Sequence, residues 1–142
     1  QIVLNLRDAK ASLFYCSKGS DSMRYRMLDV NGDYSFGRGQ QNITYGVYAV
    51  AQAIKTNLML FQNEWWEDLE NGLPIFQQII GNTGTMEHID LVDSLIKKRI
   101  TDTENVTSIS DYTSSFNREA RSYSFQCNVQ TPFGNIVVAK TF

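Results

Sequence analysis

The sequence predicts an α+β domain in which helices precede a C-terminal antiparallel meander of strands. Apolar residues recur at spacings of three and four in the middle of the chain and at a spacing of two close to its end. Helices grouped before strands are typical of α+β folds rather than of alternating α/β folds. The 142 residues, 42% of them hydrophobic, are enough to bury a sizeable core without disulfides.

The sequence predicts that the chain is divided into two parts. Residues 1–22 form an N-terminal extension whose role the sequence does not reveal, and residues 23–142 form one domain. Within the extension, residues 1–6 and 12–16 have the composition of short strands. The run Gly19-Ser20-Asp21-Ser22 is typical of a loop, so it is the expected boundary.

A hairpin-like element is expected over residues 24–36. Asn31-Gly32 stands between apolar residues there, and this pair is a strong hairpin signal because both residues tolerate a positive φ. Residues 37–42 are polar and glycine-containing, which predicts a loop after the hairpin.

Three helices are expected in the middle of the chain. The first runs from about residue 44–47 to residue 65 and has one apolar stripe. A short second helix over residues 73–80 has Pro74 in its first turn and Gly81 as its stop. The third covers residues 85–101. The stripe of the first helix consists of Val47, Val50, Ile54, Leu58, Phe61 and Trp65.

The last third of the chain predicts strands. Over residues 122–129 apolar and polar residues alternate, which is typical of a strand with one wet face. Residues 106–116 have strand composition, and the turn at residues 131–134 leads into a further strand at 136–139. The inward residues of the alternating strand are Tyr123, Phe125, Cys127 and Val129.

Composition argues against several classes of partner. The formal net charge of −2 and the absence of a basic stripe predict no nucleic-acid binding. No apolar run approaches the roughly 20 residues that span a bilayer, so we expect no membrane span. The basic cluster Lys97-Lys98-Arg99 lies near the end of the third helix, where cations complement the helix dipole. Cys16 and Cys127 are far apart and predict free thiols in a reducing compartment.

No cofactor or metal site is expected. His88 is the only histidine, too few for a histidine-based zinc site. The segment from Asp29 to Asp33 resembles the start of a calcium loop. Tyr34 and Gln40, however, occupy the positions where an EF-hand requires Gly and Glu.

The strongest candidate for catalysis is the acidic–aromatic segment at residues 64–70. A glycosidase needs two carboxylates roughly 5 to 10 Å apart, with the general acid in an apolar pocket. Glu64 with Glu67, Asp68 or Glu70, close to two tryptophans, offers such a pair. A peptidoglycan-cleaving glycosidase is therefore the alternative function, although solvated carboxylates at a helix end are the commoner arrangement.

The adjacent tryptophans raise a second hypothesis, a protein interface. Neighbouring helical residues point about 100° apart, so Trp65 and Trp66 cannot share one narrow stripe. With Trp65 on the stripe, Trp66 covers either the following helix or a partner protein. Tryptophan is a typical interface anchor.

Several stretches resemble a known family, the small baseplate wedge proteins of contractile-tailed phages and prophages, some of which carry a lysozyme label. The order of the motifs carries the resemblance more than any single one, and it extends over residues 23–142. The similar stretches are Met23 to Gly37, Ala49 to Thr56, Gln62 to Asp68, Gly72-Leu73-Pro74, Ile80-Gly81 and Val106 to Tyr112.

The resemblance implies a structural, non-enzymatic subunit of the virion tail baseplate, present in multiple copies and assembled in the host bacterial cytoplasm. Its implied partners are other baseplate wedge subunits and the tail sheath protein, whose first ring would attach to its strands. A tail-terminator or connector protein is a further structural alternative. From residue character, the interface candidates are Met59, Leu60, Glu64, Trp66, Ile136, Val137, Val138 and Ala139.

The sequence departs from that family in two respects. Residues 1–22 have no counterpart in it. The Glu-Pro-Arg signature of other wedge branches is also absent, since Pro74 follows Leu73 and Pro132 follows Thr131. How that signature docks to partners is therefore not carried over to this chain.

Overall fold

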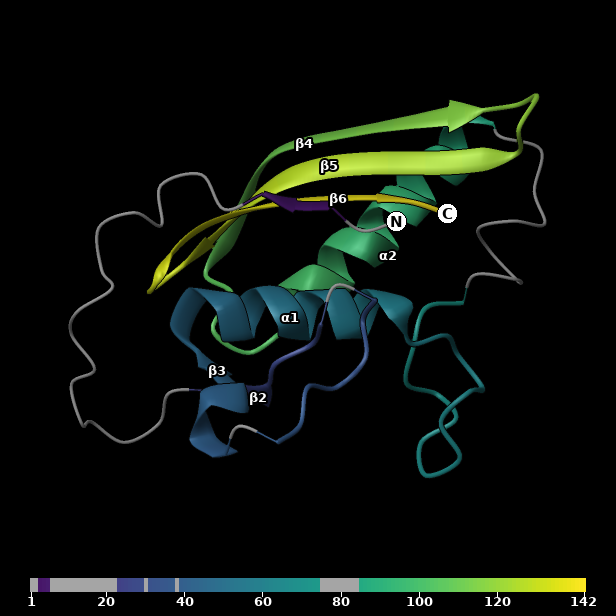
Figure 1. Cartoon of the computed structure of the whole chain (residues 1–142). Coiled ribbons are helices and arrows are strands. Elements are labelled where there is room, and N and C mark those ends of the chain that lie inside the picture. Colours follow the sequence, from purple (N-terminus) through teal and green to yellow (C-terminus); the bar gives the residue numbers. More distant parts are fainter. Residues whose placement is uncertain (1–2, 6–22, 30, 38, 75–84) are drawn as a thin grey trace.

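The computed structural model describes residues 3–5, 23–29, 31–37, 39–74 and 85–142. The strand expected at residues 12–16 and most of the helix expected at 73–80 lie outside these residues. Figure 1 shows the arrangement of the elements. They are β1 (Val3–Asn5), β2 (Arg24–Arg26), the 3-10 helix η2 (Gly39–Asn42), β3 (Ile43–Tyr45), α1 (Gly46–Met59), α2 (Met86–Thr101), β4 (Ser108–Asn117), β5 (Ser122–Thr131) and β6 (Gly134–Thr141).

Two antiparallel sheets and two helices make up the described fold. The larger sheet has the strand order β1-β6-β5-β4, and both helices cover one of its faces (Figure 1). The smaller sheet pairs β2 with β3 beside α1. The prediction of an α+β fold with a C-terminal antiparallel meander is therefore confirmed, with β4, β5 and β6 as the meander.

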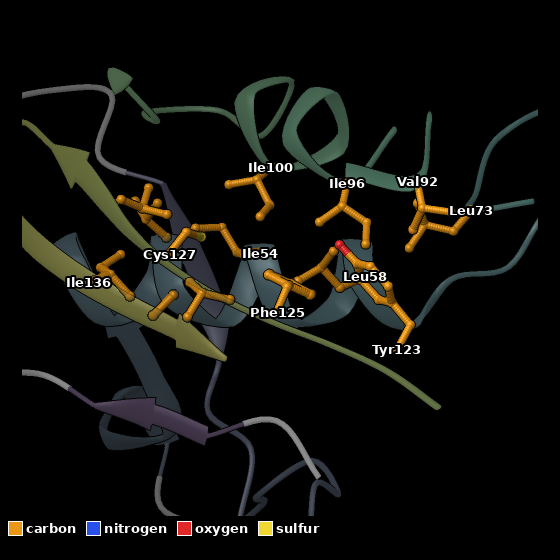
Figure 2. Close-up of a cluster of buried hydrophobic side chains, with 14 residues drawn as sticks. Ile54, Leu58, Leu73, Val92, Ile96, Ile100, Tyr123, Phe125, Cys127 and Ile136 are labelled. Atoms are coloured by element: carbon orange, nitrogen blue, oxygen red, sulfur yellow. The ribbon is translucent and has the colours of Figure 1, made fainter. Parts of the chain in front are cut away.

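The core lies between the helices and the inner face of the larger sheet. Val50, Ile54 and Leu58 supply one side from α1, and α2 adds a second stripe at a spacing of four residues. Figure 2 shows these side chains meeting those of β5 and β6. The fully buried residues from α2 and the two strands are Val92, Ile96, Ile100, Cys127, Val129, Ile136 and Val138.

The alternation predicted for the last strands is confirmed. On β5, Tyr123, Phe125, Cys127 and Val129 are all buried. Burial raises the pKa of the Cys127 thiol to about 11, so this free cysteine is a core residue and not a reactive group.

A β-bulge in β4 changes which face its side chains occupy. Ser110 pairs with Asn128 and Thr113 with Gln126, so β4 has one more residue than β5 between these pairs. Asp111 takes a positive φ of 50° at this point. Odd-numbered residues face the core before the bulge and even-numbered residues after it.

The bulge lets Tyr112 and Ser114 both face α2. The Tyr123 hydroxyl donates to Asp93 on α2, the Ser114 hydroxyl donates to the other oxygen of Asp93 over 2.9 Å, and the Tyr112 and Tyr123 hydroxyls lie 2.9 Å apart. This polar cluster joins α2 to the sheet at the edge of the core.

Three expectations about the middle of the chain were wrong in detail. The first helix ends at Met59, not at residue 65, so Phe61 and Trp65 are not helical. Leu73 does not start a helix, because it forms a parallel bridge with Phe61. The Asn31-Gly32 turn is confirmed, with a bridge between Leu28 and Tyr34. The strand before it, however, pairs with β3 instead of with the segment after the turn.

Candidate partner-binding surfaces

The first candidate surface is the tryptophan loop, which we define as residues 60–74. It leaves the C-terminal end of α1 and projects away from the core (Figure 1). Backbone hydrogen bonds close its base, from Leu73 N to Leu60 O over 2.9 Å and from Gln62 N to Leu73 O over 3.0 Å. These pairings replace the continuing helical hydrogen bonds, which is why α1 stops where it does.

Contacts inside the loop fix its shape. The Asn63 amide donates to Leu69 O over 3.0 Å, and the Phe61 amide donates to the Glu64 carboxylate over 3.0 Å. Gly72 has a φ of +128°, and a Cβ there would lie 2.5 Å from the carbonyl carbon of Phe61. Only glycine allows this close backbone approach.

Cations from two other elements anchor the base of the loop at the end of α1. Arg99 of α2 donates from Nε to Asn57 O over 3.2 Å and from Nη1 to Asn71 Oδ1 over 2.6 Å. Lys140 of β6 donates from Nζ to Leu58 O over 2.5 Å. Positive groups at these carbonyls also complement the negative end of the helix dipole.

These anchors were not foreseen. The sequence placed Arg99 at the end of its own helix, where it complements the dipole of α2. The structure shows that the same side chain reaches a different helix and the loop. Burial lowers the pKa of Lys140 to about 8. No sequence pattern linked Lys140 to α1, since the two lie 82 residues apart.

The loop exposes large apolar groups. Trp66 is 81% exposed, Leu69 53% and Trp65 39%, and Met59 at the end of α1 is 54% exposed. Leu60 is half-buried. The prediction that Trp66 lies off the core stripe therefore agrees with its position, although both tryptophans sit in a loop and not on a helix.

The loop also carries four carboxylates, which flank the two tryptophans in the sequence. Glu64, Glu67, Asp68 and Glu70 are all exposed, and residues 60–74 contain no lysine or arginine. A glycosidase acid sits in an apolar pocket, whereas these side chains are all exposed. The hollow on the outer face of β4, β5 and β6 has Ser115, Gln126 and Thr141 among its lining residues and no carboxylate. No observation on the described residues favours the glycosidase alternative.

The second candidate surface is the edge of β6. Ile136 and Val138 are fully buried, so their side chains belong to the core and are not available to a partner. Val137 and Ala139 are half-buried on the opposite face of the strand. What β6 offers to another chain is therefore its main chain. In this structure β1 pairs with part of that edge, from Val3 opposite Ala139 to Asn5 opposite Val137.

Among the described residues no group of three His, Cys, Asp or Glu side chains is placed to hold a metal ion. Within those residues, no helix is both long enough and apolar enough to cross a bilayer.

An α+β domain with an exposed aromatic loop, closed at its base by hydrogen bonds, and an edge strand has features typical of a protein-binding subunit of a larger assembly. The family model of the contractile injection system sheath initiator matches residues 23–134, which is most of the chain. The chain belongs to this family. Comparison with curated proteins finds no match.

The family match tests the family resemblance and the structural alternatives that the sequence suggested. The resemblance to contractile-tail baseplate proteins is confirmed, and the match begins at Met23, where that resemblance begins. The family has a structural role in sheath initiation, at the baseplate of a contractile tail. The match gives no support to a tail terminator or connector.

Proposed function

We propose that this sheath initiator is a wedge subunit, which joins the other wedge proteins of the baseplate to the first sheath ring without catalysis or cofactor. It occupies several positions in the virion tail baseplate and is assembled there in the host bacterial cytoplasm. Residues 23–142 act as the wedge domain, and residues 1–22 are an extension to it.

The tryptophan loop is the proposed contact with the larger wedge subunits. The observation that carries this proposal is the 81% exposure of Trp66 on a loop whose base is held by hydrogen bonds from α2 and from its own backbone. A rigid exposed tryptophan loses little conformational entropy on binding, and such residues dominate many interfaces. The carboxylates of the loop, Glu64 among them, favour a partner surface that combines an apolar recess with Arg or Lys side chains.

Replacing the anchor tests this contact. Trp66→Ala should weaken binding to the purified wedge subunits of the same tail by roughly 30-fold or more, the effect of a typical interface hot spot. Phe36→Ala is the matched control, because Phe36 is 70% exposed outside the loop. Isothermal titration calorimetry reports both affinities. Equal binding by both variants and the unmodified protein would remove the loop from the interface.

The edge of β6 is the proposed contact with the sheath. An extended segment can add to an edge strand through main-chain hydrogen bonds, while side chains set the register. The edge of β6 over residues 135–141, part of which pairs with β1, is where such a segment would pair. A photo-crosslinking residue in place of Ala139 should capture the purified sheath subunit. The same residue at Ser108, at the start of β4, should not, and capture there instead would move the contact to the other edge of the sheet.

Activity against cell walls separates this proposal from the glycosidase alternative. The purified protein should release no fragments from peptidoglycan. Glu64→Gln with Glu67→Gln should leave sheath capture unchanged. Peptidoglycan cleavage that this double variant abolishes would establish a hydrolase.

A further inference from the structure

The strand β1 occupies part of the edge that the sheath contact requires. It pairs with β6 at three positions, Val3 with Ala139, Leu4 with Val138 and Asn5 with Val137. On its other side β6 pairs with β5 at eight positions, from Gly134 to Thr141. Among the described residues, the strand partner on this edge of β6 is β1, at residues 137–139 (Figure 1).

An edge accepts only one neighbouring strand at a given position, because the main-chain N–H and C=O groups on that side can form ladder hydrogen bonds with one strand at a time. A sheath segment that pairs along β6 must then leave out residues 137–139 or displace β1. A segment that stopped short of these residues would be broken into two short pieces. Displacement allows one continuous strand.

We propose that β1 is an exchangeable occupant of the β6 edge, replaced by an extended segment of the sheath subunit on docking. The inference rests on the proposed sheath contact and adds an autoinhibitory step to it. Before docking, β1 pairs the groups that would otherwise form an open strand edge, and such edges are sites of uncontrolled association.

The lengths of the two pairings favour the exchange. Each main-chain hydrogen bond contributes only a modest net stability, and β1 makes its contacts with β6 at three residue pairs. A sheath segment can pair along up to eight positions of β6, as β5 does on the other side.

A reversible disulfide between the strands tests the exchange. Val3→Cys with Ala139→Cys places two thiols at directly opposed positions. The Cα atoms of such pairs lie roughly 4.5 to 5.5 Å apart, within the range of a disulfide. Ala139 lies on the face of the sheet away from buried Cys127, and Cys16→Ser removes the remaining thiol that could mispair.

Binding of the purified sheath subunit is then measured on the oxidised and the reduced form of the same variant. We expect the oxidised form to bind at least roughly tenfold more weakly, with full recovery on reduction. The single variant Val3→Cys, oxidised and reduced, controls for the reagents. Because the comparison is made within one protein, a general loss of folding would affect both forms alike.

The other outcomes are distinguishable. Equal binding by both forms, at the affinity of the unmodified chain, would overturn the exchange and leave the sheath contact standing at another edge. Absence of binding by the unmodified chain and both forms would overturn the sheath contact and the exchange together. Deleting residues 1–5 gives an independent check, since the exchange predicts faster association with the sheath subunit.

Discussion

Asp93 provides the most direct test of how α2 is held on the sheet. Its carboxylate accepts hydrogen bonds from the Tyr123 and Ser114 hydroxyls. A hydrogen bond to a charged group contributes roughly 1.5 to 3 kcal/mol, so Asp93→Ala would cost about 3 to 6 kcal/mol if both were lost in full. The Tyr123 hydroxyl keeps its contact with Tyr112, and the site is only partly buried. Both facts reduce the expected loss to about 2 to 4 kcal/mol.

Urea denaturation followed by circular dichroism measures this loss. With a slope of roughly 2 kcal/mol per molar urea for a domain of this size, the midpoint should fall by about 1 to 2 M. Asp90→Ala is the matched control, because Asp90 lies on the same helix and is exposed. A surface substitution of this kind changes stability by about 0.5 kcal/mol or less. If Asp93→Ala behaved like Asp90→Ala, the polar cluster would not be what joins α2 to the sheet.

Three further predictions concern the loop and the response to pH. Gly72→Ala should destabilise the domain by about 2 kcal/mol or more, because the variant combines a disfavoured φ with a clash against Phe61, and it should weaken wedge binding. Gly37 has a positive φ as well, but the space around it is open, so Gly37→Ala measures the cost of the disfavoured φ alone in parallel urea titrations. The folded-state pKa of Lys140 is lowered to about 8 from 10.5, so between these pH values the unfolded chain binds more protons than the folded one and stability should rise with pH. Urea midpoints measured at pH 7 and pH 9.5 should show this rise for the unmodified protein and not for Lys140→Met. Burial and the hydrogen bond to Asp93 raise the pKa of Tyr123 above its usual 10, so stability should fall as pH increases beyond about 10, and Tyr123→Phe should flatten that fall.

Local periodicity predicted the elements whose contacts are regular along their whole length. α2 buries Val92, Ile96 and Ile100 at a strict spacing of four, and β5 buries every second residue. In both cases the burial of one face is repeated often enough to determine the element from sequence alone. The order of helices before the meander followed from these two elements.

The errors came where distant residues decide the local conformation. Phe61 and Trp65 continue the helical spacing of α1, yet the backbone of residues 60–62 pairs with Leu73 and leaves the helix. The Asn31-Gly32 turn forms as predicted, but β3 follows η2 and takes the place beside β2. The bulge at Asp111 hides the alternation of β4, because its phase changes halfway along the strand.

The sequence indicated the exposure of the interface candidates only in part, again because contacts with distant residues decide which side chains are covered. That Trp66 lies off the core stripe could be inferred from its neighbour Trp65, but whether another helix covers it could not, and the structure leaves it 81% exposed. Val137 and Ala139 could not be separated from Ile136 and Val138, because a short run of apolar residues does not show which face is inside. That β1 shares the edge of β6 involves residues more than 130 positions apart and leaves no local signal.

The two cations at the end of α1 have a mechanical consequence for a contractile assembly. Lys140 fastens β6 to the carbonyl of Leu58, and Arg99 fastens the neighbouring carbonyl of Asn57 to Asn71 in the tryptophan loop. Tension applied to β6 would therefore reach the loop through three hydrogen bonds that meet at two adjacent carbonyls of α1. If the two proposed contacts hold, the end of α1 is the point at which the sheath side and the wedge side of the subunit are joined by these hydrogen bonds.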